Sequence, residues 1–73
     1  MTLTDLKLGE KAFVDKISAD PKLTKRLLSL GCIEGTEIIL KSIAPLGDPI
    51  IINLRGFNLA IRKIDAKNIF VHK

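Results

Sequence analysis

Apolar residues recur at every second position along Ile50–Leu54 and again along Phe57–Ile61. This period is typical of β-strands, whose successive side chains point to opposite faces of a sheet. Arg55 and Gly56 separate the two runs, and a two-residue turn there predicts a β-hairpin. In that register the apolar pairs share one face: Leu54 with Phe57, Ile52 with Leu59, and Ile50 with Ile61. A bulge at Gly56 is the alternative, because Arg-Gly is a weaker turn signal than Asn-Gly.

Three further strands are predicted, at Lys11–Ile17, Thr36–Ile43 and Ile69–Val71. Strict alternation cannot place all the apolar residues of the first strand on one face. We therefore expect a β-bulge near Asp15 and Lys16.

A single long helix is expected between the first two of these strands. The Asp20 side chain can accept from unpaired backbone N–H groups, and Pro21 suits the first helical position. Gly31 can end the helix in the left-handed conformation. Lys25 and Arg26 are expected to point away from the apolar stripe, which consists of Leu23, Leu27 and Leu30, with Leu28 beside it.

Five short strands with one inserted helix predict a mainly β fold, a small and partly open five-stranded barrel. We expect the last strand to pair near the first, the helix to plug one end, and one helical turn at Asp65–Asn68. With 73 residues, the chain is expected to form a single domain, residues 1–73.

Composition limits the classes of function. A hydrophobic content of 47% with 27% charged residues is that of a folded globular protein. The net charge of +4 arises from dispersed basic residues interleaved with acids, without tryptophan or tyrosine, so we expect no nucleic-acid binding. No apolar run approaches the roughly 20 residues of a membrane span. With one cysteine and no signal-peptide pattern, a cytoplasmic protein is expected.

The segment Ala44–Pro49 predicts a rigid loop. Its two prolines fix their own φ angles and restrict the residues before them. Gly47 can adopt a positive φ, and Leu46 is expected at the tip. Leu46 has two interpretations: it folds back as a lid over the barrel end, or it is an exposed anchor for a partner.

The Ala-Pro-Leu-Gly-Asp-Pro sequence of that loop, with Arg55 and Gly56 behind it, is also a specific motif. Other positions spaced in a matching way are Leu6, Gly9, Arg26, Leu27, Leu30, Gly31, Gly35, Leu59, Ile61, Arg62, Ala66, Ile69 and Val71. Together these residues resemble the FeoA family along essentially the whole chain. Two positions depart from its pattern: Cys32 stands where an aliphatic residue is usual, and Ala19–Pro21 replaces a more glycine-rich start of the helix.

The resemblance implies a small cytosolic SH3-like barrel that accompanies the membrane ferrous-iron transporter FeoB. The implied function is to bind FeoB and modulate uptake, so that membrane contact is only indirect. A related domain lies at the C-terminus of some iron-dependent repressors. A free-standing metal-sensing domain is therefore the alternative function. A repressor's DNA-binding part is not expected, because nothing precedes the domain in this sequence.

The expected partner-binding residues are Leu46, Asp48, Arg26, Arg55 and Arg62. Arginine is enriched at binding hot spots and suits bidentate contact with carboxylates. The alternative for these arginines is an internal ion pair, for example with Asp48 or Glu34. Weak self-association is left open.

No catalytic or metal site is expected. Cys32 follows the helix-capping Gly31 and is interpreted as a small buried hydrophobic residue. His72, next to the C-terminus, is expected to be solvated. A single His without a supporting nucleophile motif does not indicate catalysis, so we expect a non-enzyme without a cofactor.

Overall fold

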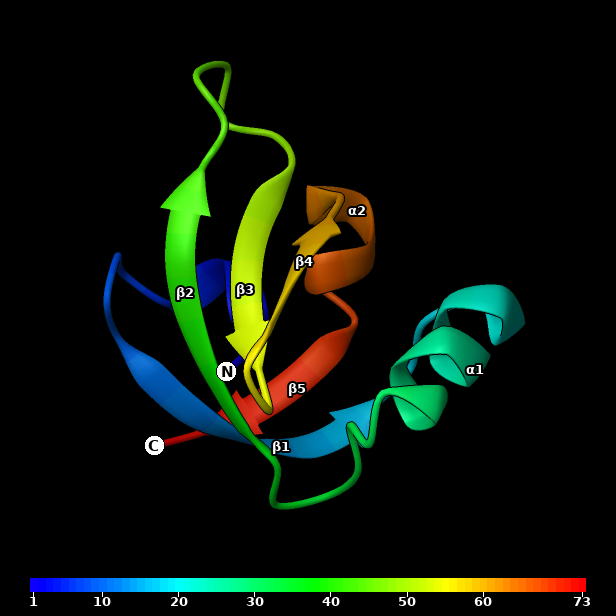
Figure 1. The fold of residues 1–73 in the computed structure, drawn as a ribbon. Coiled ribbons are helices and arrows are strands. Elements are labelled where there is room, and N and C mark those ends of the chain that lie inside the picture. Colours follow the sequence, from blue (N-terminus) through cyan, green and yellow to red (C-terminus); the bar gives the residue numbers. More distant parts are fainter.

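A computed structural model describes residues 1–73 and contains one antiparallel sheet and two helices (Figure 1). A 3₁₀ turn, η1 (Leu3–Asp5), precedes the sheet. The elements that follow are β1 (Lys11–Ile17), α1 (Pro21–Ser29), β2 (Glu37–Ile43), β3 (Ile50–Leu54), β4 (Phe57–Ile61), α2 (Lys63–Ala66) and β5 (Ile69–His72). The strand order is β4-β3-β2-β1-β5. Since β4 and β5 do not pair, the sheet is not closed, and the mainly β, partly open architecture with its inserted helix is confirmed.

The β3–β4 hairpin has the predicted register, including Asn53 opposite Asn58. Arg55 and Gly56 adopt φ angles of 50° and 87°. Positive φ at both central residues is the signature of a type I′ turn, which matches the twist of the strands. The alternative of a bulge at Gly56 is therefore wrong. Phe57 pairs with Leu54 as expected but is exposed, whereas Leu54 is fully buried.

Bulges interrupt β1 and β2. The predicted irregularity of β1 is confirmed between Val14 and Lys16, where its pairing with β5 shifts. A second shift, between Leu40 and Ser42 in the pairing of β2 with β3, was not predicted. β1 pairs with β2 through its first residues and with β5 through its later ones. The last strand thus lies beside the first, as expected.

The termini of α1 follow the predicted chemistry. Asp20 Oδ1 accepts a hydrogen bond from Leu23 N–H at 3.1 Å. At the other end Gly31 has a φ of 85°. Its N–H donates to the Leu28 carbonyl at 3.0 Å, and Cys32 N–H donates to the Leu27 carbonyl at 2.9 Å. This pair of bonds is a Schellman motif.

The helix does not plug the barrel as expected. α1 stands beside the sheet (Figure 1), and of its apolar stripe only Leu27 is fully buried. Leu23 and Leu30 are partly buried against the core, whereas Leu28 is exposed. The N-terminal turn η1 instead packs against α2 and β5.

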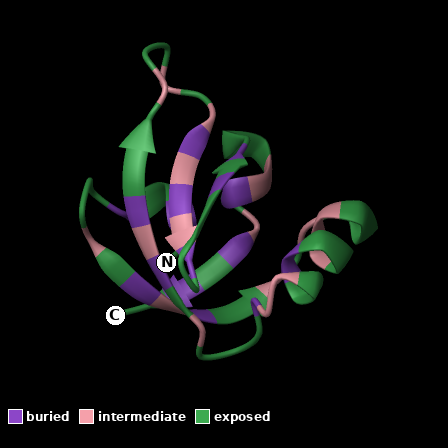
Figure 2. Cartoon of the chain, in the orientation of Figure 1, coloured by how far each residue is buried: buried purple, intermediate pink, exposed green.

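The core contains 16 buried residues, all of them apolar, and no polar or charged side chain is buried. The buried positions alternate along β3 (Figure 2). No helix is both long enough and apolar enough to cross a membrane.

The second helix begins and ends earlier than the turn predicted at Asp65–Asn68 and occupies Lys63–Ala66. The last strand extends one residue further, to His72. The N–H of Lys63, the first residue of this helix, donates a hydrogen bond to the Asp48 side chain.

Leu27 is the single fully buried side chain through which α1 joins the core. Leu27→Ala should lower the free energy of unfolding by about 2–5 kcal/mol, because it leaves a cavity at a closed site. Leu28→Ala, the same change one position along the helix, should change it by no more than about 0.5 kcal/mol. Urea denaturation of both variants measures the difference, and equal losses would contradict this packing.

Candidate functional site

The loop between β2 and β3 is held by its own backbone. Gly47, with a φ of 88°, donates its N–H to the Ala44 carbonyl at 2.7 Å. Ala44 N–H donates to the Pro49 carbonyl at 3.0 Å. The Asp48–Pro49 peptide bond is cis. The loop forms the outermost part of the molecule at the top of Figure 1.

Leu46 lies at the tip of this loop, and 97% of its surface is exposed, the highest value among the large apolar residues. The interpretation of Leu46 as a lid over the barrel end is therefore wrong, because a lid would be covered by core residues. The exposure is consistent with the anchor interpretation, which stays a prediction. Figure 2 shows the loop tip as exposed.

Asp48 connects the loop to the second helix. Its Oδ1 accepts a hydrogen bond from Lys63 N–H, at 3.1 Å. Lys63 is the first residue of α2, so a carboxylate from 15 residues earlier satisfies an unpaired N–H at a helix start. A Cβ at Gly47 would lie 3.6 Å from Lys63 Nζ, so the lysine side chain also approaches the loop. No local sequence signal indicates Lys63, because only the sheet brings the two segments together.

One of the three arginines forms an internal ion pair, as the alternative predicted, although with a different acid from the two examples given. Arg62 Nε donates to Asp65 Oδ2 at 3.0 Å, within the α2 region. Arg26 has no acidic partner within ion-pair distance, and neither has Arg55. The pairing with Asp48 or Glu34 is therefore wrong. Asp48 and Glu34 lie on segments other than those that carry the arginines. Asp48 instead accepts a hydrogen bond from a backbone N–H.

Arg55 covers the end of α1. A Cβ atom at Gly31 would lie 2.8 Å from Arg55 Nε and 2.9 Å from its Cδ. Because Gly31 has no side chain, it can adopt the positive φ of the helix cap, and it also leaves space for the Arg55 side chain. The Arg55 side chain therefore lies close to the Gly31 backbone, at the end of α1.

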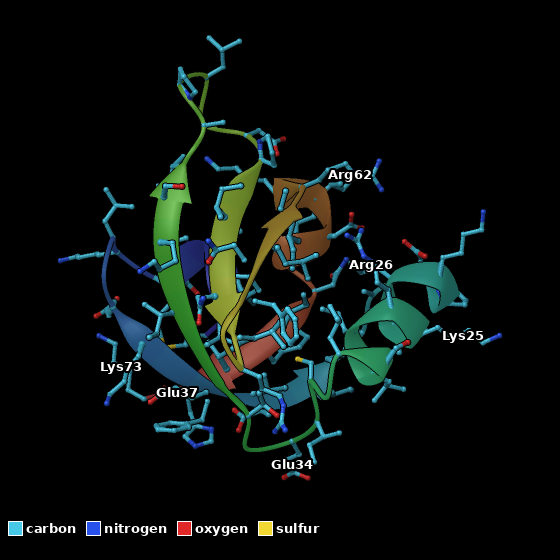
Figure 3. All side chains as sticks on the ribbon, in the orientation of Figure 1. Lys25, Arg26, Glu34, Glu37, Arg62 and Lys73 are labelled. Atoms are coloured by element: carbon cyan, nitrogen blue, oxygen red, sulfur yellow. The ribbon has the colours of Figure 1, made fainter.

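The five predicted site residues lie in three places. Leu46 and Asp48 lie in the loop that precedes β3, and Arg55 lies in the turn that follows it. Arg26 on α1 and Arg62 after β4 line one groove of about 380 Å³ between α1, β4 and α2 (Figure 3). A second hollow, of about 490 Å³, lies beside the Arg55 turn and includes Glu34 and Glu37. The expectation that Arg26 points away from the apolar stripe is wrong in part, because Leu23 lines the same groove.

The single cysteine and the single histidine lie in separate surroundings. Cys32 is fully buried, and burial raises the pKa of its thiol. His72 is half-exposed and is not merely solvated, since it contacts the Asp15 carboxylate and packs against the Phe13 ring, with 5.9 Å between ring centroids. No group of three or more His, Cys, Asp or Glu side chains is arranged to hold a metal ion.

Comparison with known families identifies the chain. The model described as "FeoA domain" matches residues 1–73. The chain belongs to the FeoA family. This family takes part in ferrous iron transport.

One relative of this FeoA chain is a fusion protein of Porphyromonas gingivalis, "Fe(2+) transport protein A/Fe(2+) transporter FeoB". The two are 31% identical over 71 residues, which is 97% of this chain but 8% of the fusion protein. The chain therefore spans only a small part of that relative's length. In that protein an FeoA domain and an FeoB transporter belong to one polypeptide.

Solved structures share the fold. The FeoA protein of Chlorobium tepidum is 40% identical and superimposes with a TM-score of 0.94, covering 99% of this chain and 69% of that one. The Stenotrophomonas maltophilia FeoA, solved in complex with zinc and described as an SH3 domain protein, is 28% identical with a TM-score of 0.83, covering 97% and 88%. The fold is therefore SH3-like. A manganese-dependent transcriptional repressor has a TM-score of 0.83 at 19% identity, over 99% of this chain and 40% of its own, which shows the fold alone.

The bond from Asp48 to α2 gives a direct prediction. Asp48→Ala should lower the free energy of unfolding by about 1 kcal/mol, because the Lys63 N–H loses its acceptor and the helix start loses a negative charge. Asp48→Asn keeps an acceptor oxygen and should lose less. Urea denaturation gives the stabilities, and amide hydrogen exchange at Lys63 reports the bond itself. Unchanged exchange at Lys63 in Asp48→Ala would contradict this role.

Proposed function

We propose that this chain is a cytoplasmic, non-enzymatic accessory domain that binds the cytoplasmic part of an FeoB-type ferrous-iron transporter and modulates uptake. The observation that carries the proposal is the Porphyromonas gingivalis relative, in which the two proteins are fused. Fusion keeps two partners at high effective concentration, which is useful when they act together.

The loop 44–49 is the contact surface that this proposal favours. Its backbone is fixed by two internal hydrogen bonds and by the bond from Asp48 to α2. A preorganised loop loses little conformational entropy on binding. Leu46 presents an apolar side chain at its tip without contributing to the core. This combination suits an anchor that enters an apolar pocket of a partner.

The metal-sensing alternative has less support. The likeness to the repressor concerns the fold alone, and zinc was found with a different FeoA protein. Stoichiometric ferrous-iron binding by this chain, abolished by Cys32→Ser or His72→Ala, would favour that alternative.

The proposal predicts direct binding to the transporter. The purified chain should bind the isolated cytoplasmic domain of its own organism's FeoB in a saturable manner, measured by calorimetry or by binding to the immobilised domain. Cells that lack this chain should show altered ferrous-iron uptake, restored by the wild-type gene. Absence of binding together with unchanged uptake would contradict the proposal.

Substitution of Leu46 tests whether binding uses a specific contact or nonspecific apolar adhesion. Leu46→Ala should weaken binding to that domain by roughly 1–3 kcal/mol, the range of hot-spot truncations. Its free energy of unfolding should change by no more than about 0.5 kcal/mol, since the side chain is exposed. Leu8→Ala is the matched control, because Leu8 is an exposed leucine in the segment before β1. Equal binding by Leu46→Ala and wild type would rule out the anchor.

A further inference from the structure

One edge of the sheet is open. β4 pairs with β3 alone, and no strand lies on its outer side. In a two-residue hairpin the residues that flank the turn, Leu54 and Phe57, form a hydrogen-bonded pair, and such pairs recur at every second position. The N–H and C=O groups of Asn58 and Ala60 therefore point away from β3. Both residues are exposed, and their backbone groups make no hydrogen bond outside the regular elements.

The opposite edge of the sheet is covered by the chain itself. Thr2 forms a β-bridge with Phe70 of β5. Val71 N–H donates to the Met1 carbonyl at 2.9 Å. The N-terminal segment thus pairs with β5 in the way that proteins usually protect an edge strand. β4 has no such partner, so it is the free edge of the fold.

A groove lies beside the C-terminal end of the free edge. Its volume is about 380 Å³, and it is lined by α1 on one side and by the end of β4 and the start of α2 on the other. Leu23 of α1 and Ile61 of β4 give it an apolar part. The groove lies beside Ala60, whose backbone groups are unpaired. An added strand would lie about 4.8 Å from β4, within this space.

The unbalanced charge of the groove is positive. Three basic side chains line the groove against two acidic ones, of which Asp65 pairs with Arg62 and Asp20 caps α1 while keeping its charge. Lys22 and Arg26 are the other two basic side chains, and neither has an ion-pair partner within the chain. Figure 3 shows Arg26 on the side of α1 that faces β4 and α2, whereas Lys25 points away from it. A partner that enters the groove is therefore selected for negative charge.

We propose that the free edge of β4 and the adjacent groove bind an extended, acidic segment of a partner protein, which adds to the sheet as a sixth strand. Main-chain bonds to Asn58 and Ala60 supply the affinity, and Lys22 and Arg26 select carboxylates. The inference deepens the proposed function, and it rests on that function only for the source of the segment, which would be the transporter.

The test uses two synthetic peptides of equal length, one alternating glutamate with valine and one alternating lysine with valine. The full chain, labelled with ¹⁵N, is titrated with each at low salt. The acidic peptide should shift the amide signals of Asn58 and Ala60 most strongly and slow their hydrogen exchange, and added salt should weaken the effect. The lysine peptide should leave these signals in place.

Variants separate the groove from overall charge. Arg26→Glu should weaken binding of the acidic peptide about tenfold. Lys25→Glu makes the same charge change on the same helix, facing away from the groove, and should change binding by less than about twofold. Ala60→Pro removes an outward N–H and should abolish binding while leaving the β3–β4 pairs intact, because edge strands tolerate proline there. If this variant does not fold, the Arg26 and Lys25 pair still decides the question.

Three results would overturn the proposal. They are unmoved Asn58 and Ala60 amides, equal weakening by Arg26→Glu and Lys25→Glu, and shifts that depend on the concentration of the chain alone, which would assign the edge to a second copy. The same variants distinguish this inference from the proposed function. Peptide binding at β4 without any binding of the transporter domain would support the groove and contradict the proposed function. Transporter binding that leaves the Asn58 and Ala60 signals unchanged would support the proposed function and contradict the role of the groove.

Discussion

The burial of β3 is the constraint on which the rest of the structure depends. Ile50, Ile52 and Leu54 point into an entirely apolar core, and β2 and β4 flank this strand on either side. A shift of one residue would expose all three side chains, so the register of the neighbouring strands is fixed with it. The loop 44–49 and the Arg55–Gly56 turn then lie at opposite ends of one rigid strand. The positions of the two proposed binding surfaces depend on this strand.

Because the core is small, a peripheral helix such as α1 has few side chains that pack into it. α1 joins the core through the fully buried Leu27, with Leu23 and Leu30 partly buried beside it, and its end lies close to the Arg55 side chain. The space between α1 and β4 remains open as a groove. Chains of this size bury only about 60% of their unfolded surface. Open grooves and free edges are therefore expected in such a domain, and binding a partner is one way to cover them.

The two surfaces proposed for binding meet at the junction of β4 and α2. Asp48 of the loop accepts from Lys63 N–H, and the preceding Arg62 lines the groove. The two surfaces are therefore connected through two adjacent residues, Arg62 and Lys63. Membership of the FeoA family and the fusion to FeoB in one relative make the transporter the natural partner to test.

The sequence by itself determined the local structure of this protein. Period-two alternation placed Asn53 opposite Asn58, and Asp20, Pro21 and Gly31 marked the ends of α1, because these signals depend on neighbouring residues. The tertiary structure alone decided the long-range contacts. These contacts are the bond from Asp48 to Lys63 and the approach of Arg55 to Gly31, and the exposure of Leu46 likewise depends on how distant segments pack. The second bulge, in the pairing of β2 with β3, was likewise not predicted from the sequence. Interactions between neighbouring residues therefore determined the strands and the helix ends. Contacts between distant segments determined the positions of the candidate binding surfaces.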